Sequence, residues 1–347
     1  MASGNRNLVL QLLLTAKDEM SSIISKVFGF LDKTTSASAN FVREKLGNLF
    51  GGGTQSAQDF EAALARVKAK ADATDAQMVQ LKAAAQAAAI DLKLGADGAS
   101  KAAQALEFLT GAGLSVKQAI SALPTVLRIA TNEQISAKDA AEALTDVMSV
   151  MGIAFDQSGR AADILQKAAD ATKTSVTALA EAIRAGGGAA VNAGYSYEQT
   201  VAILMAFAKA GIQGSAAGTA LTNVLNDIAN PASKARQEMA KFGASTGDVR
   251  TFIGKLIELG PQGIQVMRGF SEEAGPGLAA LLKVGVKGLD EYQQAVERDA
   301  VGALKRASDT IGNTTTGALD RLAAAWTQVK TTLAEPLVNI PRQSRGL

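Results

Sequence analysis

Residues 194–221 read GYSYEQTVAILMAFAKAGIQGSAAGTAL, and this stretch decides the fold. Ser196 stands where a helix N-cap is expected, so we predict a helix over 196–210. Gly211 follows it directly, as glycine often does at a helix end, and a second helix is predicted over 215–229. The stretch therefore predicts a tight helical hairpin.

The glycines of this hairpin have two possible meanings. The run 211–219 is superficially similar to a phosphate-binding loop, but such a loop needs a lysine after its last glycine, where Thr219 stands here. No strand is predicted before the run either. We therefore interpret the glycines as helix-packing positions, where a missing side chain lets a neighbouring helix come close. These positions are Gly211, Gly214 and Gly218.

Short helices and glycine turns continue on both sides of the hairpin. Ser136 and Pro231 mark helix starts, and Gly186 is expected to end a helix. The alternation predicts an all-α fold of short, Gly-punctuated helices stacked as helical hairpins. The predicted helices are 101–110, 115–130, 136–151, 158–171, 174–185, 196–210, 215–229, 231–241 and 246–259.

An internal repeat agrees with stacked hairpins. Residues 113–119 match 194–200 at an offset of 81, and residues 143–148 match 220–225 at an offset of 77. We interpret the two copies as degenerate helical hairpins, the second with an inserted helix. Chance similarity within an alanine-rich sequence is the alternative.

Residues 59–94 carry an apolar heptad pattern, which predicts one long, coiled-coil-like helix near the N-terminus. Two interpretations stay open. The helix either associates with a second copy of the chain, or packs as an amphipathic helix on its own domain. We name its candidate self-association residues the heptad seam: Leu64, Val67, Ala71, Met78, Leu81, Ala85 and Leu92.

Changes in pattern along the chain predict five segments. A short extended piece at 7–14 and a helix at 18–33 are expected in the first segment, and an amphipathic helix at 316–333 near the end of the chain. The segments are an N-terminal strand and helix segment (1–54), the heptad helix (55–98), a helical core (99–260), a Gly-rich connection with closing helices (261–335) and a disordered tail (336–347).

Composition excludes several classes of function. The chain of 347 residues has no His and no Cys, so it has no imidazole catalyst, thiolate nucleophile, disulfide or cysteine-based zinc site. A net charge of +2 and 4% aromatic residues give little basis for binding nucleic acid. We predict no catalytic residue, no cofactor and no metal site.

Two other functions stay open as alternatives. The longest apolar run, 201–208, is too short to span a membrane, but a membrane-active protein could expose such hairpins on insertion. A carboxylate-based glycan hydrolase is a remote alternative. Its acid and base would come from Glu272 with Glu273 or Asp290 with Glu291. No signal peptide is evident.

Several stretches resemble the core of phage tail tape measure proteins of the TP901 type, in the same order. The stretches are 144–171, 176–182, 193–200, 211–221, 288–292 and 319–326. The opening 8–18 is also similar to the start of such proteins. The resemblance covers most of the chain and is strongest over 144–225.

This resemblance implies a structural protein of the virion tail lumen, made in the bacterial host cytoplasm. Such proteins set tail length and nucleate tube assembly. The implied partners are tail tube and tail tip proteins, tail assembly chaperones and further copies of the chain. Since such proteins usually continue well beyond this core, we expect the chain to be an N-terminal portion or a truncated frame. The tail at 341–347 departs from the family pattern.

Overall fold

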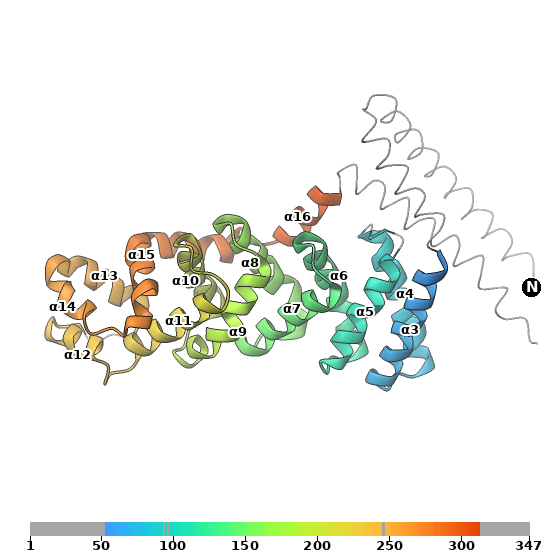
Figure 1. Cartoon of the computed structure of the whole chain (residues 1–347), viewed down its shortest axis with the longest axis horizontal. Helices are drawn as coiled ribbons and strands as arrows, with labels where there is room; N and C mark the ends of the chain where they lie inside the picture. Colours follow the sequence, from blue (N-terminus) through green and yellow to red (C-terminus); the bar gives the residue numbers. More distant parts are fainter. Residues whose placement is uncertain (1–52, 93, 96, 245–246, 313–347) are drawn as a thin grey trace, which may run out of the picture. The chain divides into compact units, whose positions relative to one another are not determined.

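The structure, a computed structural model, describes residues 53–92, 94–95, 97–244 and 247–312, and the regular elements in these ranges are all helical (Figure 1). The all-α prediction is confirmed for these residues. Two compact units are present. One contains the described residues up to Leu127 and from Asp309 on, and the other is Arg128–Ser308. The elements expected at 7–14, 18–33, 316–333 and 336–347 lie outside the described residues.

The first unit contains α3 (Gly53–Ala71), α4 (Asp75–Asp91) and α5 (Gly98–Gly111). Both α3 and α4 pack on α5. The long helix α6 (Val116–Glu133) begins in this unit and continues into the second.

The structure corrects the prediction of one long helix over 55–98. The chain turns at Asp72, whose φ of +46° is left-handed, and α4 then begins at a capping box on Thr74. The backbone N–H of Gln77 donates to the Thr74 hydroxyl at 3.3 Å, and the Gln77 side chain accepts from the Thr74 N–H at 2.9 Å. A capping box starts a helix, so the heptad pattern is divided between two helices.

The second unit stacks helices in two rows. One row contains α7 (Ala137–Met151), α9 (Val176–Asn192) and α11 (Gly214–Ala229), with α9 packed on both neighbours. The other contains α8 (Ser158–Thr172) and α10 (Tyr197–Lys209), and α15 (Gly275–Arg298) packs on both. Figure 1 shows these helices following one another as an array. The expectation of stacked helical hairpins is therefore met in this unit.

The remaining helices of the second unit are short. They are η1 (Phe155–Gln157), α12 (Lys234–Lys241), α13 (Val249–Leu259), η2 (Gly260–Gln262), α14 (Gly263–Met267), η3 (Glu272–Ala274) and α16 (Ala303–Gly312), which ends beyond the unit. In the Gly-rich connection expected from 261, Gly285 has a φ of +69° and divides α15 into two helical parts.

The division between the two units differs from the predicted boundaries after 98 and 260. The first boundary fails because α5 packs on α3 and α4, so both sides of residue 98 share one core. The second fails because α13 packs on α15, which places residue 260 inside the second unit.

Helix starts recur with a period of roughly 40 residues, the range of helical repeat proteins. The first helices of successive pairs, α4, α6, α8 and α10, begin at residues 75, 116, 158 and 197. Their partners α5, α7, α9 and α11 begin at 98, 137, 176 and 214. The offset of 81 between the two sequence copies thus equals two periods, from 116 to 197.

Two helix backbones cross at very close range in the second unit. A Cβ built on Gly186 of α9 would lie 2.3 Å from the carbonyl oxygen of Gly218. A Cβ on Gly218 of α11 would lie 2.5 Å from the carbonyl oxygen of Ala182. Gly187 faces the other neighbour, since its Cβ would lie 2.7 Å from Val150 of α7. We call the Gly186–Gly218 contact the glycine crossing.

The glycine crossing explains why the expected helix end at Gly186 is wrong. Glycine inside a helix costs about 0.5–1 kcal/mol relative to alanine, which is why it suggests a stop. Here Gly186 and Gly187 allow α9 to pack closely between α7 and α11. The surface buried in these two contacts stabilises the helix by more than the glycines cost. The helix therefore continues to Asn192.

We predict that Gly218→Ala lowers the free energy of unfolding by at least about 2 kcal/mol, because its methyl group would overlap the α9 backbone. The matched control is Gly188→Ala, two residues from the crossing, where a Cβ meets nothing within 4 Å. The control should raise stability by about 0.5–1 kcal/mol. Urea unfolding followed by circular dichroism measures both. Equal stability of Gly218→Ala and wild type would contradict the close approach of α9 and α11.

Candidate functional site

The heptad seam lies inside the first unit. Leu64 and Val67 on α3 and Leu81 and Ala85 on α4 are buried. The other three residues, at the helix ends, are half-buried: Ala71, Met78 and Leu92. Because both helices pack on α5 of the same chain, the seam stabilises this unit. Self-association stays a prediction, and it needs a different surface.

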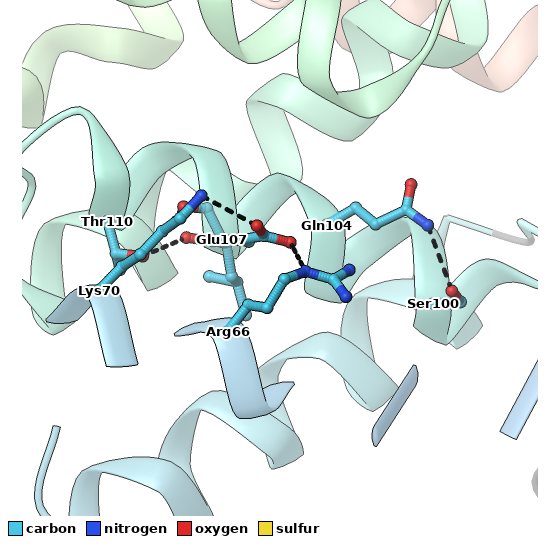
Figure 2. A network of polar contacts seen from close by, with 7 residues as sticks. Arg66, Lys70, Ser100, Gln104, Glu107 and Thr110 are labelled. Carbon is cyan, nitrogen blue, oxygen red and sulfur yellow. Dashed lines mark hydrogen bonds and ion pairs between the residues drawn. The ribbon is translucent and has the colours of Figure 1, made fainter. Parts of the chain in front are cut away.

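A polar network crosses the interface between α3 and α5 (Figure 2). The Nε of Arg66 donates to one carboxylate oxygen of Glu107 at 2.8 Å, and the Nζ of Lys70 donates to the other at 2.9 Å. Arg66 and Lys70 lie one helical turn apart on α3, so one carboxylate holds both. Glu107 is not among the predicted site residues. In the sequence it is a single acidic residue between apolar neighbours on α5.

Arg66 and Lys70 keep the carboxyl group of Glu107 ionised. Burial alone would raise the pKa of this carboxyl, but the hydrogen bonds from Lys70 and Arg66 outweigh burial and hold the pKa below its usual value. The carboxylate is therefore charged at neutral pH and ties α3 to α5.

A second polar cluster joins the loop before α10 to α13 and α15. The hydroxyl oxygen of Tyr195 accepts a hydrogen bond from the backbone N–H of Val249 at 2.6 Å. Arg250 forms an ion pair with Asp290 at 3.0 Å and donates to the side chain of Gln293. The cluster brings together two of the resembling stretches, 193–200 and 288–292.

The cavity at this cluster is too small for an organic ligand. Its volume is about 20 Å³, enough for roughly one water molecule, whereas small-molecule pockets measure hundreds of Å³. Burial raises the pKa of Tyr195 to about 12, so its hydroxyl stays neutral. The neighbouring Tyr197 is buried and donates to the carbonyl oxygen of Ala161 at 2.8 Å. Both tyrosines thus have structural partners.

The carboxylates considered for glycan hydrolysis are partly or fully exposed, and two of them face cations. Asp290 pairs with Arg250, and Glu291 lies 3.9 Å from Lys287. Glu272 and Glu273 are exposed on η3. Within the described ranges, no group of three or more acidic side chains could hold a metal ion.

The three glycines singled out in the sequence have different surroundings. Gly218 lies at the glycine crossing. A Cβ on Gly214 would lie 2.8 Å from the carboxylate of Glu181, and a Cβ on Gly211 would meet nothing. Gly211 instead adopts a φ of +85°, which ends α10.

The amino-acid sequence of the chain is similar to that of known phage proteins. The family model described as phage-related minor tail protein matches residues 82–295, more than half of the chain. The tape measure protein of Pneumococcus phage Dp-1 is 29% identical over 290 residues, which are 78% of this chain and 24% of that protein. The probable tape measure protein of Escherichia phage P2 is 26% identical over 251 residues, 72% of this chain and 29% of that protein.

The matched part of the chain thus spans only 24% and 29% of the length of these two relatives. No solved structure matches it. The residues matched by the family model include both the glycine crossing and the cluster at Tyr195 and Arg250.

We predict that Glu107→Gln destabilises the chain by about 1 kcal/mol at neutral pH, because Arg66 and Lys70 are about half exposed. A lowered folded-state pKa stabilises the fold above the usual carboxyl pKa, and this contribution is lost as the pH falls through the lowered value. The difference from wild type should therefore vanish on acidification.

Urea unfolding of the full chain at neutral and acidic pH measures this difference. The control is Glu61→Gln, whose exposed carboxylate lies 3.5 Å from Lys82 and should contribute little. A Glu107→Gln effect that is independent of pH would contradict the role of the charge.

Proposed function

The chain belongs to the family of phage-related minor tail proteins, and on this premise we propose that it is a structural tail component that acts as part of a tape measure protein. The observation that carries the proposal is the family match over 82–295, which includes the packing of the second unit. The names of the two tape measure relatives support the same role.

The packing of the second unit is better suited to contacts with other tail proteins than to spanning the length of a tail. In the second unit a pair of helices, about 40 residues, adds roughly one helix diameter of 10 Å to the array. The same residues in one continuous helix would extend about 60 Å. We therefore infer that the described residues serve a tape measure protein as a folded assembly module.

The partners follow from that role. We propose that the chain contacts tail tube and tail tip proteins and tail assembly chaperones, and that it associates with itself. It would assemble in the cytoplasm of the bacterial host and end in the lumen of the virion tail. We propose no catalytic activity, because the polar side chains described above form hydrogen bonds and ion pairs within the fold.

We predict that peptide mass spectrometry detects this chain in tail particles purified from the producing strain. A Gly218→Leu substitution in the gene should reduce assembled tails strongly, because the larger side chain cannot fit the glycine crossing. The Gly188→Ala control should assemble normally. Electron microscopy of negatively stained particles counts the tails. Absence of the chain from tails that assemble normally would overturn the proposed function.

Membrane insertion is the second candidate, and one observation favours it. Among the described residues no single helix is long and apolar enough to cross a bilayer. Tyr197–Lys209 and Gly214–Ala229 together match a membrane span in length and composition only, and they are bent by 118° relative to each other. In the fold, residues 200–208 of α10 are all buried and form part of the core of the second unit. Insertion would therefore require this unit to open.

We predict that the folded chain causes no leakage of dye from liposomes at neutral pH, because α10 is enclosed by its neighbours. The destabilised Gly218→Ala variant provides the comparison, since it opens more readily. Leakage by the wild-type chain would favour the membrane-active function instead.

A further inference from the structure

One acidic side chain of α8 binds the start of α16. The two carboxylate oxygens of Asp163 accept hydrogen bonds from the backbone N–H groups of Gly302 and Leu304, at 2.7 and 3.0 Å. The first N–H groups of a helix have no partner within the helix, and a negative charge beside them is favourable. Asp163 therefore caps a helix that lies far away from it in the sequence.

A second contact reaches the same turn from α6. The Nδ2 of Asn132 donates to the carbonyl oxygen of Leu304 at 3.3 Å and to the Oε1 of Gln166 on α8 at 3.2 Å. Asn132, like Asp163, bonds to the backbone of α16. The start of this helix is thus held by polar side chains of α6 and α8.

Residues 299–308 bury little apolar surface. Ala300, Ala303 and Leu304 are buried, so only one large apolar side chain enters the core. The other residues of this segment are half-buried or exposed, and Val301 is 67% exposed. Hydrophobic stabilisation grows with the apolar area removed from water. The hydrogen bonds to the charged Asp163 therefore supply a large share of the attachment of this segment.

The same segment is also organised internally. Gly302 has a φ of +73°, so the chain turns sharply between α15 and α16. The guanidinium of Arg306 donates to the carbonyl oxygens of Val301 at 2.7 Å and Asp299 at 3.3 Å. These bonds lie within the segment, so they persist if it moves as one piece about the end of α15.

The attached arrangement carries a cost at Asn132. Its Oδ1 is buried and accepts no hydrogen bond from the described residues. A buried acceptor without a donor is unfavourable, and movement of Leu304 away from Asn132 would expose this oxygen to solvent. Detachment of the segment would relieve this cost, which opposes the hydrogen bonds to Asp163.

We propose that residues 299–308 form a detachable strap, and that Asp163 holds this strap closed. With the strap closed, the chain leaves the second unit beside α6 and α8. With the strap open, it leaves this unit at the end of α15. The strap thus determines the exit point of the residues that follow Ser308. This inference goes beyond the proposed function and does not depend on it.

Thiol labelling of the full chain measures the opening of the strap, because the chain has no native cysteine. Ala303→Cys places a thiol on the strap at a position that is 4% exposed, so it reacts when the strap opens. Ala280→Cys, at a position of α15 that is 3% exposed, measures opening of the rest of the unit. The rate of reaction with an aromatic disulfide reagent under native conditions measures each opening.

Asp163→Asn is the deciding change, because it keeps the size of the side chain and removes the charge. We expect it to raise the labelling rate of Ala303→Cys by about tenfold or more, and that of Ala280→Cys by less than about twofold. Asp156→Asn, at an exposed position of η1, removes the same charge and is the matched control. It should leave both rates unchanged.

Gly302→Ala is a second change that leaves α8 intact. A side chain is unfavourable at a φ of +73°, so this variant should also speed labelling of Ala303→Cys and not of Ala280→Cys. Equal acceleration at both cysteines would show that the strap opens only with the whole unit. No acceleration by Asp163→Asn would show that Asp163 does not hold the strap. Either result would overturn the inference, whether or not the chain is present in tails.

Discussion

The second unit depends on the contact between the backbones of α9 and α11 at Gly186 and Gly218. Only glycine allows two helices to meet at this distance, and the approach positions everything stacked on them. It brings α11 near enough for α15 to pack against it, where Gly277 lies close to Phe207 and Val224. A chain with few aromatic residues fills its core by close approach of backbones instead of large side chains.

Much of the fold could be predicted from the sequence because its signals are local. Serine caps, positive-φ glycines and apolar periodicity located the helices between 101 and 260 to within a few residues. The predictions failed where one residue type is compatible with two different local structures. Gly186 was expected to end a helix, but its neighbours in space make it a packing position. Thr74 lay within the heptad pattern, although its spacing to Gln77 is that of a capping box.

The polar contacts were much less predictable, since they join residues far apart in the chain. Asp163 on α8 accepts from the backbone N–H groups of Gly302 and Leu304, at 2.7 and 3.0 Å. Asp227 on α11 likewise accepts from the N–H and hydroxyl of Ser271. Each is one acidic residue on a helix, and nothing in the local sequence shows that it satisfies the end of a distant segment. Glu107 and Arg250 are similar cases.

The period of roughly 40 residues also determines how the second unit responds to force. Helices in a row contact mainly their neighbours, so a chain pulled at its end can release one pair at a time. Each pair would free about 130 Å of extended chain. However, α15 packs on α8, α10 and α11, so its contacts stabilise two successive helix pairs at the same time. Tension on the C-terminal side must therefore detach α16 from Asp163 and then α15 before the pairs behind them yield in turn.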